Sequence, residues 1–154
     1  MKFEKFLKST GTHGAVVTVS ESEKWLECGG VSMVIPRGVD NLLGGRSNSE
    51  FLSITHELAK VEYDEPLTLV SAVLLDPQGK ANDIYRVFET DLGERVAITN
   101  ADYGLLEKGD LLSYAEIEVP ESEDGLDDVT KIKYVMVFDE NGNIQGYITG
   151  SQKF

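Results

Sequence analysis

The chain has 154 residues, of which 41% are apolar and 27% are charged. These values are typical of a soluble globular domain, and they exclude collagen, a coiled coil and wholesale disorder. A chain of this length buries enough surface to fold without a metal ion or a disulfide. We therefore expect a single domain over residues 1–154 and no cofactor.

The net charge of −13 comes from 27 acidic and 14 basic side chains. A field of this sign repels phosphate backbones and anionic lipid headgroups, which argues against direct contact with nucleic acid or with a membrane. Two interpretations of the charge stay open. It keeps the chain soluble, or it binds a basic partner, including by mimicry of nucleic acid at the binding groove of another protein.

Signals for export are lacking. Cys28 is the one cysteine, so no disulfide can form within the chain. The opening segment, 1–8, is charged throughout and has no apolar core of the kind that a signal peptide needs. The longest apolar stretch, 67–75, is too short to span a bilayer. These features predict folding in a reducing cytoplasm and no secretion by a signal peptide.

Apolar residues at helical spacing predict a short N-terminal helix over 2–8. Runs of β-branched residues separated by turns then predict an antiparallel meander over 14–35, and a loop with three glycines follows over 36–48. Ser47 and Glu50 match a capping box, in which each side chain bonds the backbone of the other residue. A main helix is therefore predicted over 49–61.

Period-two alternation dominates the second half of the chain. It predicts a strand over 67–75 and a hairpin formed by 84–89 and 94–99. An amphipathic strand is predicted over 111–119, and a further hairpin surrounds the turn at 139–143.

The register of this last hairpin follows from its buried face. A three-residue loop with Gly142 in the left-handed conformation pairs Phe138 with Ile144 and Tyr134 with Ile148, which keeps the large apolar side chains on one face. This arrangement predicts a type I turn followed by a G1 bulge.

Together the elements predict an α+β fold. It is mainly antiparallel β-sheet, built from hairpins and a meander, with one main helix near 49–61 and a short N-terminal helix. The expected core comprises Phe3, Phe6, Trp25, Ile35, Phe51, Leu58, Leu69, Val87, Ile98, Ile117, Tyr134, Met136, Phe138 and Ile148.

From Asp110 to Asp128 the chain carries many carboxylates and no Lys or Arg. We predict a flexible acidic loop at about 120–129. It is a solvated connection, a docking site for a basic surface, or a weak divalent-ion site built from oxygen ligands, although nothing in the spacing fixes a ligand geometry. The candidate partner-binding residues are Glu121, Glu123, Asp124, Asp127 and Asp128.

Signals for catalysis are weak. Cys28 and His13 leave a nucleophile–base pair open, but neither residue carries a family signature. His56 is expected to be a partly exposed histidine on the surface of the main helix. The segment 44–47, Gly-Gly-Arg-Ser, resembles an anion nest before a helix, although glycines there also serve the turn itself.

Asp139, Asn141 and Asn143 match the first three ligand positions of an EF-hand loop. The match fails at Ile144, where glycine is required, and at Gly150, where a bidentate glutamate is required. We assign these residues to the hairpin turn. The sequence therefore predicts no catalytic, cofactor-binding or metal-binding residue and a protein that is not an enzyme.

Four segments carry a likeness to known proteins: 1–14, 24–31, 36–44 and 100–108. They resemble small acidic proteins encoded in phages and prophages of low-GC Gram-positive gut bacteria. The resemblance transfers no catalytic residue. It implies a viral gene product expressed with the head-assembly genes.

This context suggests a bacteriophage protein that acts by protein–protein contacts, as a capsid-associated structural or accessory component of the virion. Its expected partners are other phage proteins of the capsid or neck, and an oligomeric state within an assembly fits this role. The alternative is an anti-defence or host-takeover protein in the host-cell cytoplasm, whose acidic surface blocks a basic nucleic-acid-binding host protein.

Overall fold

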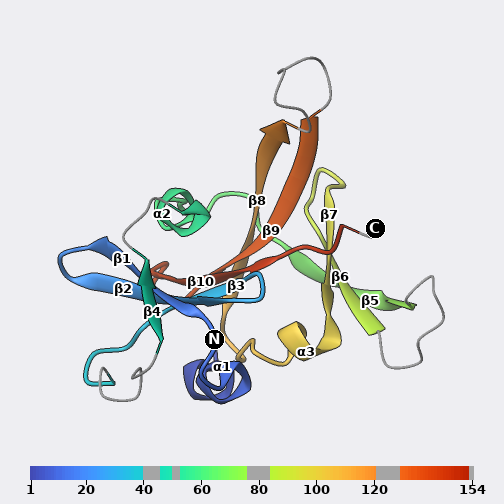
Figure 1. Cartoon of the computed structure of the whole chain (residues 1–154). Helices are drawn as coiled ribbons and strands as arrows, with labels where there is room; N and C mark the ends of the chain where they lie inside the picture. The colour runs from blue at the N-terminus through green and yellow to red at the C-terminus, as the bar shows by residue number, and fades with distance from the viewer. Residues whose placement is uncertain (40–45, 50–52, 76–83, 121–128, 153–154) are drawn as a thin grey trace.

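The structure is a computed structural model that describes residues 1–39, 46–49, 53–75, 84–120 and 129–152 (Figure 1). The elements in chain order are α1 (Phe3–Thr10), β1 (Ala15–Ser20), β2 (Glu23–Cys28), β3 (Val31–Val34), β4 (Ser47–Ser49), α2 (Ile54–Leu58), β5 (Thr68–Leu75), β6 (Ile84–Glu89), β7 (Arg95–Thr99), α3 (Asn100–Tyr103), β8 (Leu111–Pro120), β9 (Val129–Phe138) and β10 (Ile144–Thr149).

The strands form two sheets. The larger sheet has seven strands in the order β4-β1-β2-β3-β10-β9-β8, and only the β1–β4 pair is parallel. The predicted meander over 14–35 is confirmed as β1, β2 and β3. The pairing of β3 with β10 joins this meander to the last hairpin, so the two ends of the chain share one sheet.

The smaller sheet has three antiparallel strands in the order β5-β6-β7. The hairpin predicted from 84–89 and 94–99 is confirmed, with β7 beginning one residue later. Backbone hydrogen bonds from residues next to the strands connect the two sheets. Leu67, just before β5, donates its N–H to Leu112 O at 2.9 Å, and Ser151, just after β10, donates its N–H to Ala97 O at 2.7 Å. The α+β class and its mainly antiparallel sheet are therefore confirmed.

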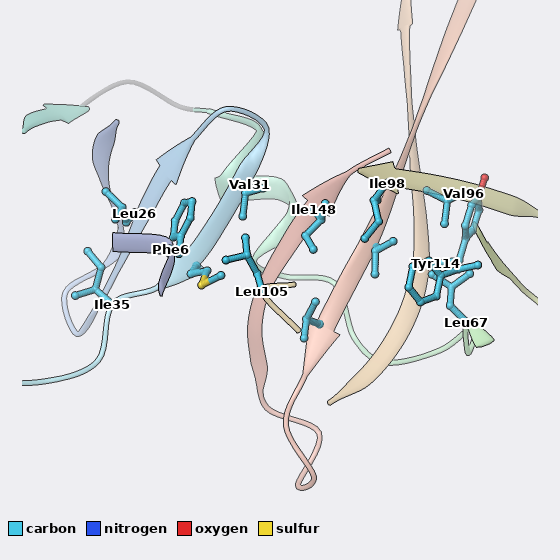
Figure 2. Packing of buried hydrophobic residues seen from close by; sticks show 14 of the residues in the cluster. Phe6, Leu26, Val31, Ile35, Leu67, Val96, Ile98, Leu105, Tyr114 and Ile148 are labelled. Atoms are coloured by element: carbon cyan, nitrogen blue, oxygen red, sulfur yellow. The ribbon is translucent and has the colours of Figure 1, made fainter. Parts of the chain in front are cut away.

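Alternating side chains of the larger sheet bury both of its faces. One face packs with α1 and the smaller sheet in a first cluster, which Figure 2 shows running from Phe6 and Leu26 to Val96 and Leu67. The other face packs under α2 in a second cluster, formed by Trp25, Leu58, Tyr134, Met136, Phe138 and Tyr147. The molecule thus has the larger sheet as its central layer.

Most residues of the predicted core are buried, and two of them are only partly buried. Phe3 and Ile117 are partly buried and pack against the first and second clusters. The prediction for Leu69 was wrong, because this side chain is 44% exposed on β5, which forms an edge of the smaller sheet. Phe51 lies outside the described residues.

The helix near 49–61 differs from the prediction. α2 begins only after Ser53, whose backbone N–H donates to His56 Nδ1 at 3.0 Å in a capping box. The predicted start was wrong because Ser47–Ser49 forms β4, which pairs with the distant strand β1. Within the described ranges, no helix is both long enough and apolar enough to cross a membrane.

The last hairpin confirms the predicted turn but only part of the predicted register. Phe138 pairs with Ile144, and the glycine of the turn has a positive φ, as the G1 bulge requires. A second irregularity directly after Ile144 then shifts the pairing by one residue. Tyr134 therefore lies opposite Thr149, and the predicted pair with Ile148 was wrong.

The start of the chain is fixed to the connection between α3 and β8. The Met1 ammonium donates to both carboxylate oxygens of Asp110, at 3.0 and 2.8 Å, and both groups are largely buried. Lys2 N also donates to Leu105 O at 2.8 Å. These bonds place the first residues beside the junction of the two sheets.

Candidate functional site: the arm of β8 and β9

Two strands of ten residues each form the longest hairpin of the described chain. Their register runs from Leu111 opposite Phe138 to Pro120 opposite Val129. β10 pairs with β9 as far as Tyr134, and Gly150 N then donates to Lys133 O at 2.7 Å. From residue 132 outward the hairpin is a two-stranded ribbon. Figure 1 shows it extending away from the rest of the molecule. We call residues 117–120 and 129–132 the arm.

A charged face begins at the base of the arm. Glu116 and Lys133 lie opposite each other, and Glu116 Oε1 is 3.9 Å from Lys131 Nζ. Lys133 Nζ donates to Arg95 O at 3.0 Å and lies 3.6 Å from Glu94 Oε2. Exposed ion pairs of this kind contribute little stability. The contacts of Lys133 with Arg95 and Glu94 place the base of the arm beside the β6–β7 hairpin.

Tyr114, two residues before Glu116 on β8, forms a hydrogen bond to this charged face. Its hydroxyl donates to Glu116 Oε2 at 2.7 Å. Burial, followed by the hydrogen bond to Glu116 and the negative charge of Glu116, raises the pKa of Tyr114 well above its usual value. The phenol therefore stays a protonated donor at neutral pH and fixes the carboxylate of Glu116.

The opposite face of the arm is apolar. Ile117 and Ile132 lie opposite each other and pack, half-buried, at the margin of the second cluster. Val119 continues this stripe outward and is 40% exposed. The apolar stripe thus runs from the core of the protein to the described end of the arm. Such an amphipathic ribbon can pack its apolar face against another protein while its charged face stays in water.

The five acidic residues predicted to bind a partner are Glu121, Glu123, Asp124, Asp127 and Asp128. They lie outside the described residues, so the prediction stays a prediction. The paired residues Pro120 and Val129 are the last described positions on either side of them. In the sequence, the acidic residues therefore connect the two strands of the arm.

A buried polar cluster beneath α2 was not predicted. Thr55 is completely buried; its hydroxyl donates to Glu27 Oε2 and lies 2.8 Å from the hydroxyl of Tyr147. Ser32, also completely buried, is its third neighbour, with Oγ at 3.4 Å. The sequence signal that would have placed Thr55 on the inward face of the helix is its spacing of three residues from Leu58. The cluster fixes α2 over the second cluster and holds Tyr147 in place.

The free energy of unfolding at alkaline pH is expected to depend on Tyr147 of this cluster. Burial, aided by the charge of Glu27, raises the pKa of Tyr147 to about 12, whereas a tyrosine in an unfolded chain titrates near pH 10. The stabilisation is complete below about pH 10 and is lost as the pH rises through about 12, because the unfolded state ionises first. In urea titrations across this range, Tyr147→Phe is expected to lose less stability than the wild type. If the wild type and Tyr147→Phe lost the same free energy of unfolding across this pH range, the raised pKa of Tyr147 would be contradicted.

The residues considered for catalysis and anion binding lie in structural settings. Cys28 ends β2 and is half-buried, and His13 is exposed in the turn after α1. His56 is half-buried, which agrees with a partly exposed surface histidine, and its Nε2 lies 3.0 Å from Thr18 O. The Arg46 guanidinium donates to Thr10 Oγ1 at 3.1 Å. Since β4 follows Arg46, the predicted helix start beside the anion nest was wrong.

Asp139 serves the hairpin turn, as the sequence indicates. Its carboxylate accepts hydrogen bonds from the backbone N–H groups of Asn141 and Asn143, at 2.8 and 2.9 Å. These backbone hydrogen bonds, with that from Asn143 first, lower the pKa of Asp139. A search of the described residues finds no group of three or more His, Cys, Asp or Glu side chains placed to hold a metal ion.

Comparison with known proteins identifies no relative of this chain. A scan against family models gives no match. Searches of curated proteins and of solved structures likewise give no significant match. The arm, which extends away from the rest of the molecule and exposes an apolar stripe, is therefore the feature on which a function can rest.

Proposed function

We propose that this chain is a non-enzymatic bacteriophage protein that acts through contacts with other proteins, as a capsid-associated accessory component of the virion. The arm is the observation that carries this proposal. An isolated two-stranded hairpin is at best marginally stable in water. A ribbon that extends beyond its sheet and exposes an apolar stripe is suited to packing against a neighbouring subunit.

The viral context comes from the sequence. The segments 1–14, 24–31, 36–44 and 100–108 resemble small acidic phage proteins. A virion component needs a stable body and a surface that reaches its neighbours. The larger sheet, with a buried cluster on each face, can form the stable body, and the arm can form the surface that contacts the neighbours.

Mass spectrometry of gradient-purified virions tests this proposal, with the copy number compared with that of the major capsid protein. A stoichiometric amount in the particle is the expected result. Absence from virions, together with clear expression in infected cells, would overturn the virion assignment.

A shortened arm tests the surface itself. Replacing residues 119–130 with Asn-Gly connects the paired residues Glu118 and Lys131 through a two-residue turn and leaves the base intact. We expect the variant to fold but to be lost from virions. Leu92→Ser is the matched control, since Leu92 is 86% exposed in the β6–β7 turn. Normal incorporation of the shortened protein would exclude residues 119–130 as the contact.

The strong negative charge favours a second candidate, an anti-defence or host-takeover protein that blocks a basic groove of a host protein. This function requires the acidic residues rather than the apolar stripe. Changing Glu121, Glu123, Asp124, Asp127 and Asp128 to their amides should then abolish salt-sensitive binding to the host protein. Unchanged binding would exclude the mimicry.

A further inference from the structure

A cavity of ≈ 420 Å³ opens where the two sheets meet. Its apolar wall comes from four separate elements: Leu69 of β5, Phe88 of β6, Tyr103 of α3 and Leu112 of β8. The rings of Phe88 and Tyr103 contact each other, with centroids 6.2 Å apart. Its volume falls within the range of about 300–1,000 Å³ that is usual for small-molecule sites.

The charged part of the lining holds two lysines and two carboxylates, and an ammonium group next to the cavity offsets one of these carboxylates. Lys2, Lys108, Glu107 and Asp110 line the cavity. The charge of Asp110 is already balanced by the Met1 ammonium, at 2.8 Å. Neither Lys2 nor Lys108 forms an ion pair with any residue that the structure describes. Lys2 and Lys108 therefore bring two cations without an ion-pair partner among the described residues to the lining, against the one carboxylate of Glu107, in a chain whose net charge is −13.

We propose that this cavity binds a small amphipathic anion, with an aromatic or short acyl body and a single carboxylate or sulfonate group. The apolar body packs between Phe88, Tyr103 and Leu112. The anionic group lies toward Lys2 and Lys108, where the local field is favourable. This site is separate from the arm and does not depend on the proposed virion function.

The exposure of Leu69 fits the same site. A leucine that is 44% exposed on an edge strand gains little from folding alone. At the mouth of the cavity, this side chain can cover the apolar body of a bound molecule. Binding would therefore remove from water an apolar surface that the folded protein otherwise leaves exposed.

Fluorescence titration with 1-anilinonaphthalene-8-sulfonate tests the proposal, since this probe joins an aromatic body to one sulfonate. We expect saturable binding of one molecule per chain, weakened by added salt because the attraction is partly electrostatic. The uncharged analogue N-phenyl-1-naphthylamine is expected to bind more weakly. Equal or tighter binding of the uncharged analogue would overturn the proposal.

Two variants locate the binding. Lys108→Glu reverses one of the two cations, and Leu69→Asp places a carboxylate at the mouth; each is expected to raise the Kd of the sulfonate probe about fivefold or more. Both positions are exposed, so the fold should tolerate the changes, which circular dichroism will verify. Lys60→Glu is the matched control, because this exposed lysine follows α2 and does not line the cavity. Unchanged or increased probe binding in both test variants would refute the site.

Discussion

Replacing Trp25 with alanine is expected to lower the free energy of unfolding by about 3–5 kcal/mol. Trp25 is completely buried in the second cluster, and its ring centroid lies 6.2 Å from that of Tyr147. Its indole N–H donates to Glu23 Oε1 at 2.6 Å. The substitution leaves a large cavity between the larger sheet and α2. Since small domains are stable by only about 5–15 kcal/mol, this loss is a large share of the total.

Urea denaturation followed by circular dichroism is the suitable measurement, because Trp25 is the one tryptophan and the variant loses its fluorescence signal. Leu92→Ala is the control: the side chain is 86% exposed, and we expect a change within about 0.5 kcal/mol. A loss below about 1.5 kcal/mol for Trp25→Ala would mean that the second cluster collapses to fill the space.

The variant Gly146→Ala is expected to lose about 1–3 kcal/mol through overpacking. Gly146 lies on β10 between β9 and β3, opposite Met33. An added Cβ would clash with the carbonyl oxygen of Ser32, lie 2.7 Å from Met1 Sδ and lie 3.1 Å from Met33 Cα. The Met1 side chain can move, but the backbone of β3 can yield only by separating from β10.

Gly142→Ala separates this steric effect from a purely conformational one. Gly142 has φ 82°, and its added Cβ would meet nothing within 4 Å. We expect a cost of about 1–2 kcal/mol, confined to the turn. Amide hydrogen exchange distinguishes the two variants, because only Gly146→Ala should speed exchange in β3. Full protection of β3 in Gly146→Ala would contradict the predicted clash.

Local pattern predicted the elements whose partners are close in sequence. The meander and both hairpins follow from alternation and turn residues, and the pair Phe138–Ile144 follows from the turn geometry. The pattern failed where a distant strand decided the outcome. Ser47 reads locally as a helix cap, yet it pairs with β1. Ser53 is the actual N-cap. It does not match the usual capping-box pattern, because His56 rather than Glu or Gln completes the box.

The candidate site was predicted only in part. The alternation over 111–119 correctly indicated an amphipathic strand, now β8. That the hairpin extends past its neighbours depends on where β10 stops pairing with β9, which no local pattern encodes. The cavity also escaped prediction, because Leu69, Phe88 and Leu112 belong to separate strands that only the packing of the two sheets brings together.

The pairing of β3 with β10 has a consequence for how fast the protein folds. Val31 lies opposite Ile148, so the centre of the larger sheet closes between residues from nearly opposite ends of the sequence. Closing so long a loop costs entropy before its contacts form, and folding slows as the mean sequence separation of contacts increases. The meander and the last hairpin can form early as local units. Until they meet, the edges of β3 and β10 that pair in the native sheet stay exposed, so the slow step of folding is also the step most open to aggregation.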